Sequence, residues 1–249
     1  MEKLTSNQYS SIKKMVAVAS GKGGVGKSTV TALLACQLVK KGYKVGILDA
    51  DITGPSIARM FNVESMAYVE DEMIIPNESE NGIKIVSGNM LVPNPNAPIV
   101  WRAPIMNNVI RQFYTDVKWG ELDYLLVDLP PGTGDIPLTV LQVYPLDGLL
   151  VVATGQGLVS MIVSKAINMA KSLQVPLLGV IENMSYIVCP DCGKKIDLFA
   201  SDLDQLQGVE VLDKLPLEKE TTLLADEGQI DQAATELPNT LAALEKLNA

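Results

Sequence analysis

The stretch Gly21-Lys22-Gly23-Gly24-Val25-Gly26-Lys27-Ser28-Thr29 satisfies the pattern G-x-x-x-x-G-K-[ST] and places a second lysine directly after its first glycine. An apolar run from Met15 to Ala19 precedes it, and a helical pattern that stops at Gly42 follows it. Glycines let the backbone curl so that successive N–H groups point at phosphate oxygens, and the dipole of the following helix adds positive partial charge there. The sequence therefore predicts a strand, a phosphate-binding loop and a helix N-terminus.

The side chains of this loop have separate predicted roles. Lys27 is expected to reach the β- and γ-phosphates of a nucleotide, and Ser28 to offer its hydroxyl to Mg²⁺. Lys22 stands at the start of the loop and points outward, so we expect it to reach a nucleotide across a two-fold interface. The alternative is a solvated surface lysine. Nucleotide contacts are predicted for Gly23, Gly24, Val25, Gly26, Lys27, Ser28 and Thr29.

Length and charge restrict the class of protein. The 249 residues, 47% of them hydrophobic, can form one α/β domain, which we place at residues 15–249 after a flexible polar segment at 1–14. The formal charge of −9 predicts no general attraction to nucleic acid or to an anionic membrane. Because we find no apolar run of about 18 residues and no signal-peptide pattern, we expect a cytoplasmic protein.

Apolar runs alternate with helical patterns along the chain. Strands are expected at Met15–Ala19, Lys44–Asp49, Leu122–Asp128, Gly148–Ala153, Pro176–Glu182 and Val209–Lys214, and helices at Pro104–Val117, Val159–Leu173, Glu218–Glu227 and Thr235–Leu247. Strands that are apolar throughout are typical of a parallel sheet covered on both faces. We therefore predict a three-layer α/β fold of the P-loop NTPase type, with its site at the carboxyl ends of the strands.

Three aspartates follow these strand patterns. Asp128 ends a buried strand, where a carboxylate would hold Mg²⁺ through water opposite the phosphate loop. Asp49 and Asp51 end the adjacent strand, and Asp51 is the predicted residue that activates the attacking water. The alternative is that both cap the helix that begins near Ser56.

The cysteines and the absence of histidine limit the metal chemistry. The chain has three cysteines and no histidine, so a metal site would have to use thiolates or carboxylates. Cys189-Pro190-Asp191-Cys192-Gly193 places two thiolates in a tight turn, whereas Cys36 lies in the first predicted helix and is read as a buried hydrophobe. A zinc ion or an iron–sulfur cluster takes about four ligands, so the missing pair is expected from a second copy on a two-fold axis. A redox dithiol and a structural zinc turn are the alternatives.

Taken together, these motifs resemble the Mrp/ApbC iron–sulfur cluster carrier ATPases, in the deviant Walker A class that also contains the MinD/ParA and nitrogenase iron-protein groups. The resemblance spans about Lys14 to Pro216. The lysine-bearing phosphate loop marks the class, and the narrower resemblance rests on Asp49–Ser56, Trp101–Pro104, Trp119–Tyr124, Asp128–Asp135 and Glu182–Tyr186 followed by the cysteine pair. The stretch Lys194–Ser201 departs from the family, which usually shows a histidine and a glycine-rich phenylalanine segment there.

The resemblance implies a homodimeric ATPase that carries a cluster to apo-proteins and works with a cluster assembly scaffold. It implies that ATP lies at the dimer interface, that Lys22 contacts the partner's nucleotide and that Asn183 contacts adenine. Paired Cys189 and Cys192 would hold a transferable [4Fe-4S] cluster. The rival hypotheses are a MinD/ParA-like positioning ATPase, an electron-donating reductase and a zinc-stapled dimer. The tail Leu241–Leu247 lacks the basic charge of a membrane-binding helix, which disfavours the first rival.

Overall fold

The computed structural model describes residues 3–52, 54–63, 68–88, 103–156, 159–201 and 209–248. Within these ranges a nine-stranded sheet runs in the order β10-β9-β8-β1-β7-β2-β6-β5, and β11 pairs with β9. Its strands are β1 Ser10–Ser20, β2 Val45–Asp49, β5 Asn77–Glu78, β6 Lys84–Ser87, β7 Gly120–Asp128, β8 Gly148–Ala153, β9 Leu177–Val188, β10 Lys195–Asp197 and β11 Val211–Pro216. Only β5 and β10 pair antiparallel, so the expected mostly parallel α/β sheet is confirmed.

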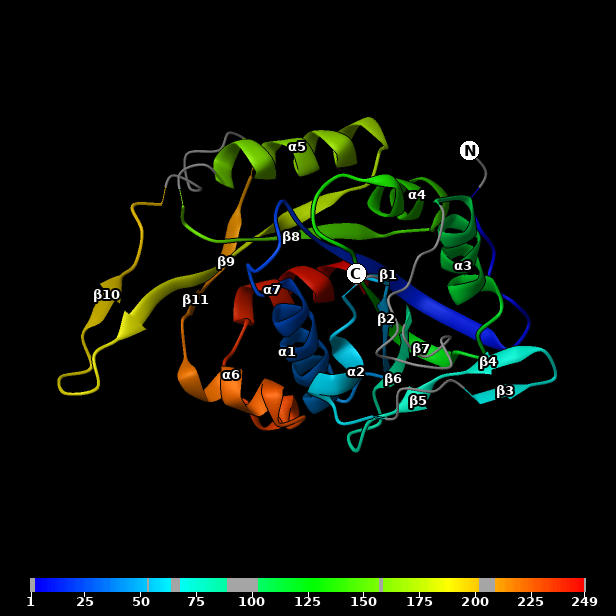
Figure 1. Ribbon diagram of the computed structural model, residues 1–249, viewed down its shortest axis with the longest axis horizontal. Coiled ribbons are helices and arrows are strands. Elements are labelled where there is room, and N and C mark those ends of the chain that lie inside the picture. Colours follow the sequence, from blue (N-terminus) through cyan, green and yellow to red (C-terminus); the bar gives the residue numbers. More distant parts are fainter. Residues whose placement is uncertain are drawn as a thin grey trace.

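Helices cover both faces of the sheet (Figure 1). One layer contains α3 Ala103–Thr115, α4 Asp135–Val143 and α5 Val159–Ser172, and the other contains α1 Lys27–Lys40, α2 Ile57–Met60, α6 Lys219–Asp226 and α7 Pro238–Glu245. A separate hairpin pairs β3 Tyr68–Glu70 with β4 Met73–Ile75. Each layer packs its own apolar cluster onto the sheet. None of the helices in the described ranges has the length and apolarity that crossing a bilayer requires.

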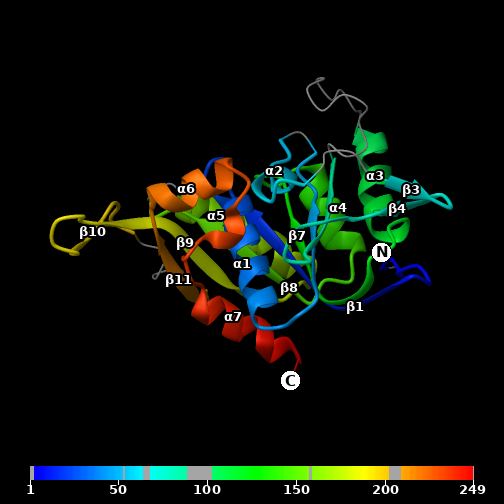
Figure 2. The ribbon, with the colours of Figure 1, turned by 90° about the horizontal axis from the view of Figure 1, so that it is seen from below.

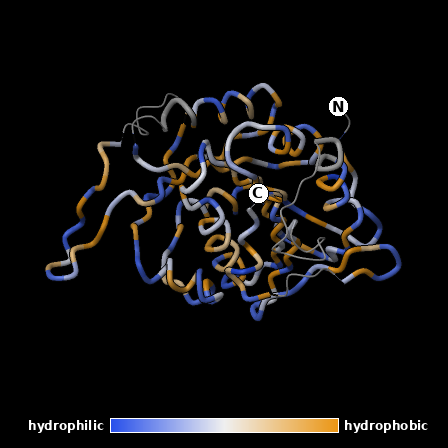
Figure 3. Tube along the Cα trace, viewed as in Figure 1, coloured by the Kyte–Doolittle hydropathy of each residue, from blue (hydrophilic) through white to orange (hydrophobic). Residues whose placement is uncertain are grey.

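The strands at the centre of the sheet are apolar along their whole length because both of their faces are covered. All six residues of β8 are buried, as are all five of β2. Figure 3 shows these inner segments as hydrophobic and the loops at the rim as more hydrophilic. β2 and β8 run in the same direction as β1, so the carboxyl ends of the three strands lie at one edge of the sheet. The loops that follow these strands meet at that edge (Figure 1).

Two strand boundaries differ from the sequence prediction by five residues or more. β1 begins at Ser10, inside the segment predicted to be flexible, and its first residues pair with β7 from Gly120 onward. Exposed and half-buried positions alternate there, so only one side of the strand is partly covered and no apolar run marks it. β9 continues beyond Glu182 to Val188, through polar residues that hid the strand. Trp101, Arg102 and Thr53, which belong to the family-like stretches, lie outside the described residues.

Candidate nucleotide site

The phosphate loop connects β1 to α1 at the carboxyl edge of the sheet. Gly24 and Gly26 both have φ +78, a left-handed conformation that glycine adopts without strain. A cavity of about 220 Å³ opens over the loop, and its lining includes the segment from Lys22 to Thr29 together with Asp51 and Pro131. The residues predicted to contact phosphate therefore surround one cavity at the N-terminus of α1, where helix and loop amides favour an anion.

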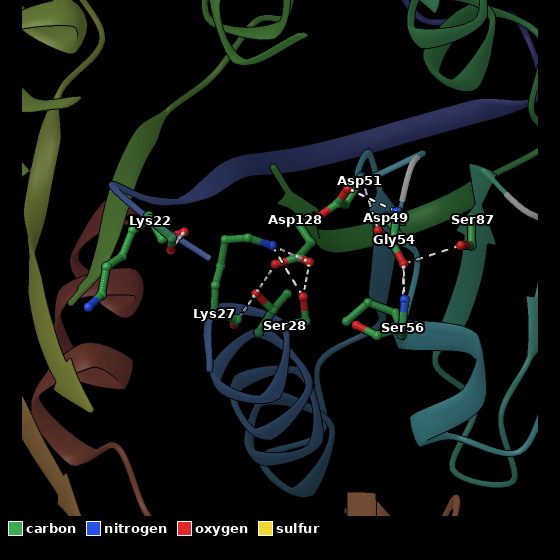
Figure 4. A network of polar contacts seen from close by, with 12 residues as sticks. Lys22, Lys27, Ser28, Asp49, Asp51, Gly54, Ser56, Ser87 and Asp128 are labelled. Atoms are coloured by element: carbon green, nitrogen blue, oxygen red, sulfur yellow. Dashed lines mark hydrogen bonds and ion pairs between the residues drawn. The ribbon is translucent and has the colours of Figure 1, made fainter. Parts of the chain in front are cut away.

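The buried carboxylate of Asp128 connects the loop to the sheet (Figure 4). Its Oδ2 lies 2.6 Å from the Lys27 Nζ and accepts a hydrogen bond of 2.5 Å from the Ser28 hydroxyl. Its Oδ1 accepts a hydrogen bond of 2.7 Å from the Thr31 hydroxyl. Three donors from the first turns of α1 thus converge on one carboxylate at the end of β7.

This arrangement fits a magnesium ion chemically. A serine hydroxyl beside a carboxylate is an all-oxygen set of the kind that Mg²⁺ takes together with water and phosphate. Ser28 and Asp128 would hold the ion between them, and the ion would neutralise phosphate charge. In this structure Lys27 is paired with Asp128, so reaching a phosphate requires its ammonium group to leave that carboxylate.

Asp49 and Asp51 have different surroundings. Asp49 is completely buried and accepts hydrogen bonds from the backbone N–H groups of Asp51, Ser56 and Ile57 and from the Ser87 hydroxyl. It therefore holds the start of α2, as the capping alternative proposed. Burial, together with repulsion from Asp128, raises the pKa of Asp49 to about 7 despite these donors.

Asp51 lines the phosphate cavity instead. Its Oδ1 accepts a hydrogen bond of 3.2 Å from the Gly54 N–H, which fixes the loop that carries it. Figure 4 shows Asp51 beside Asp49 and Gly54, in the loop that follows β2. Of the two carboxylates, Asp51 is therefore the one whose position suits a water near the transferred phosphate.

Lys22 points away from the other charged groups of the loop (Figure 4). Its Nζ donates a hydrogen bond of 2.6 Å to the Gln156 Oε1, in the segment that follows β8. The two lysines of the motif therefore have different partners within one chain, with Lys27 on the buried carboxylate and Lys22 on an exposed amide.

A second cavity, of about 200 Å³, adjoins the first through Gly26, Thr29 and Met60. Its lining also includes Asn183, whose Nδ2 donates a hydrogen bond of 2.9 Å to the Val25 carbonyl. A Cβ at Gly26 would lie 2.2 Å from that Nδ2, so only glycine allows this approach. The lining mixes apolar and polar side chains, a surface that can take a nucleotide base beside the phosphate cavity, and the contact of Asn183 with adenine stays a prediction.

The cysteine turn lies far out on the β9–β10 hairpin, which extends beyond the rest of the molecule in both views (Figures 1 and 2). The Gly193 N–H bonds the Cys189 carbonyl, and the Cys189 N–H bonds the Lys194 carbonyl, so the turn is closed on both sides. Hydrogen bonds from the backbone of Asp191 and Cys192 and from the Cys192 side chain lower the pKa of the Cys189 thiol. Cys192 is exposed, whereas Cys36 is buried in α1.

The turn does not hold a complete set of metal ligands. Among the described residues there is no group of three or more histidine, cysteine, aspartate or glutamate side chains placed to share a metal ion. Two thiols at the end of a projecting hairpin are, however, open to a second chain.

Thr31 is the residue that sequence reasoning missed. It is completely buried, and its hydroxyl holds the Asp128 oxygen that neither Lys27 nor Ser28 uses. The available signal was its spacing, because Thr31 lies four residues after Lys27 and so one helical turn along the same face. A threonine in a predicted helix interior usually bonds only the preceding turn, which concealed the role.

Comparison with known proteins identifies close relatives. The model of the ParA family described as NUBPL iron-transfer P-loop NTPase matches residues 11–248. A protein named iron-sulfur cluster carrier protein from Clostridium perfringens is 44% identical over 242 residues, which are 92% of this chain and 85% of its own. The protein of the same name from Methanocaldococcus jannaschii is 46% identical over 225 residues, 88% of this chain and 78% of its own.

Solved structures with a similar fold include a nucleotide-binding protein and a MinD protein. A nucleotide-binding protein from Archaeoglobus fulgidus, in complex with ADP, has a TM-score of 0.79 at 43% identity over 89% of this chain and 88% of its own. The septum site-determining protein MinD from Pyrococcus horikoshii, complexed with Mg-ADP, has a TM-score of 0.63 at 18% identity over 94% of this chain and 96% of its own. The second likeness shows a shared fold only.

The role of Thr31 can be tested with Thr31→Val, which keeps the shape and removes the hydroxyl. Asp128 Oδ1 would then lose its donor, and a lost hydrogen bond to a charged group costs about 1.5–3 kcal/mol. We expect Mg²⁺ to enhance ADP affinity at least about tenfold less than in the wild type, as measured by calorimetry with and without Mg²⁺. Thr31→Ser should restore the enhancement, and an unchanged enhancement in a folded Thr31→Val protein would contradict the role.

The raised pKa of Asp49 predicts a pH dependence of stability. Between its ordinary value of 3.8 and about 7, the folded chain keeps the Asp49 proton while the unfolded chain has lost it. This contribution to the free energy of unfolding is complete below the ordinary value and falls as pH rises through the window, by at most about 1.4 kcal/mol per pH unit. Urea unfolding should show a flatter profile between pH 4 and 7 for Asp49→Asn than for the wild type. Equal slopes for Asp49→Asn and the wild type would contradict the pKa.

Proposed function

Because this chain belongs to the ParA family of NUBPL-type iron-transfer P-loop NTPases, we propose that it binds and hydrolyses ATP. We also propose that two copies of the chain form a dimer that carries one iron–sulfur cluster at its interface. The observation that carries the proposal is the combination of a phosphate loop centred on Asp128 with a pair of projecting thiols that has no further ligands among the residues the structure describes. The relatives named iron-sulfur cluster carrier proteins support the cargo.

In the proposed hydrolysis, phosphates occupy the cavity over the loop and the base occupies the adjoining cavity beside Asn183. Lys27 moves from Asp128 to the β- and γ-phosphates, and Ser28 and Asp128 hold Mg²⁺. Asp51 orients the attacking water and accepts its proton. Lys22 leaves Gln156 and places its charge on the nucleotide of the second copy, where it stabilises the transferring phosphoryl group.

In the proposed carrier, Cys189 and Cys192 of two chains meet on a two-fold axis and supply four thiolates to one [4Fe-4S] cluster. The exposed position of the turn suits both loading from an assembly scaffold and release to an apo-protein. We place this activity in the cytoplasm. The same four sulfurs would also suit a zinc ion. The alternative function is therefore a dimer that zinc holds together and that carries no cluster.

The trans role of Lys22 predicts a selective kinetic defect in Lys22→Ala. The lost charge acts on the transition state, so the maximal ATPase rate should fall about 100-fold while the affinity for ATP stays nearly constant. The surface variant Lys44→Ala, whose lysine pairs with Glu121 away from the loop, is the matched control and should behave as the wild type. A normal maximal rate with a raised KM would contradict the role.

Ligand counting predicts the stoichiometry of the cargo. After anaerobic treatment with iron and sulfide, absorption and Mössbauer spectra should report about one four-iron cluster per dimer. Cys189→Ala and Cys192→Ala should each abolish stable cluster binding, whereas Cys36→Ala should retain it because that thiol is buried in α1. A colourless zinc protein, or iron undiminished in the double cysteine variant, would contradict the cluster assignment.

A further inference from the structure

Strand β9 connects the second cavity, named the base cavity because the nucleotide base is placed there, to the turn that carries Cys189 and Cys192. β9 reaches the phosphate loop at Asn183, and Cys189 follows directly after the strand ends at Val188. Cys189 lies six positions after Asn183, a distance of about 20 Å in extended chain. Both sites of the proposed function are thus parts of one continuous segment without an intervening flexible loop.

The strand has an irregularity between the two sites. Lys214 of β11 pairs with Glu182, but Pro216, two residues further, pairs with Tyr186, four residues further along β9. The additional residues form a bulge toward the phosphate loop, and Met184 within it has φ 54. A residue other than glycine is strained in this left-handed region, and the conformation persists only where its surroundings hold it.

Contacts on both sides hold the bulge. On the nucleotide side, Asn183 bonds the Val25 carbonyl, and the Met184 Cε would lie 3.6 Å from a Cβ placed at Gly26. On the thiol side, the Leu198 N–H bonds the Ser185 carbonyl. Met184 therefore stands between a residue fixed to the phosphate loop and a residue fixed to the hairpin.

Residues of the β9 bulge also line the base cavity. Asn183 and Met184 of β9 contribute to it, together with Pro216 and Leu217 at the end of β11. The Leu217 N–H in turn bonds the Tyr186 carbonyl, just beyond the bulge. A base in this cavity would contact both strands where the β9–β10 hairpin begins, and it would favour the hairpin orientation in which these residues line the cavity.

We propose that nucleotide in the base cavity fixes the orientation of the β9–β10 hairpin through the left-handed conformation of Met184, and so controls the position of the thiol pair. The inference rests on the proposed function, since it takes a nucleotide as the ligand and the thiols as the carrier site. Met184 acts as a positioning residue because its constrained backbone transmits a contact at Asn183 to the hairpin.

Amide hydrogen exchange of the cluster-free full chain, with and without saturating Mg-ADP, tests this directly. The probes are the amides of Gly193 and Leu198, which bond the Cys189 and Ser185 carbonyls, and the reference is the remote Ile74 amide, which bonds the Asp116 carbonyl. ADP should slow exchange of the two hairpin amides at least about fivefold and leave Ile74 unchanged. Calorimetry on the same samples reports occupancy independently of hydrolysis and of any cluster.

Two variants at position 184 separate backbone constraint from the loss of the side chain. Met184→Gly and Met184→Val both remove the thioether, but glycine adopts φ 54 without strain, whereas β-branched valine strongly disfavours it. At saturating ADP, Met184→Gly should retain the protection of the hairpin and Met184→Val should lose it. Gln174→Val, which places valine at another left-handed position (φ 57) after α5, controls for general destabilisation and should retain the protection.

Several results would overturn the inference. Bound ADP that leaves Gly193 and Leu198 exchange unchanged in the wild type would do so, as would full protection in Met184→Val, or lost protection in Met184→Gly or in Gln174→Val. A wild-type chain that fails to bind ADP in the calorimeter would overturn the proposed nucleotide function as well, and calorimetry distinguishes that failure from the others.

Discussion

The buried charge of Asp128 is the constraint on which the rest of the site depends. A carboxylate taken out of water at the end of β7 is very unfavourable unless it is paired and hydrogen-bonded, and α1 supplies an ammonium group and two hydroxyls. Meeting that requirement docks the first turns of α1 against the sheet and sets the shape of the phosphate loop. It also affects Asp49, because a second carboxylate at the end of the neighbouring strand retains its proton more strongly beside the first.

The fold could be predicted where sequence and burial agree. β2 and β8 are apolar because both faces are covered, and the glycine loop has the fixed spacing of its motif between a buried strand and a helix, so these elements lie where the pattern placed them. The first half of β1 and the outer half of β9 were missed because their side chains are polar or half exposed. Their pairing is set by neighbouring strands distant in sequence, which a local pattern does not contain.

The site was predictable to a similar depth. The loop lysines and Ser28 belong to a motif with fixed spacing, Asp128 stands at the end of a predicted buried strand, and the structure brings Lys27, Ser28 and Asp128 together. The sequence predicted only in part which of Asp49 and Asp51 holds the start of α2 and which lines the phosphate cavity. These positions depend on which carboxylate the N-terminus of α2 covers. Thr31, the Gln156 partner of Lys22 and the bulge around Met184 all depend on contacts across the sheet edge, and sequence spacing specifies none of them.

The projecting hairpin also exposes an unpaired sheet edge. β10 is the last strand on its side, its three residues are all exposed, and Val188 and Ile196 keep 46% and 45% of their surface in water. Such an edge can recruit strands of other molecules into open-ended aggregates. Here the strand is very short, and Lys195, whose Nζ lies 4.4 Å from the centre of the Tyr186 ring, carries charge along it. A short and charged edge strand therefore leaves the cysteine turn accessible while it disfavours open-ended association through β10.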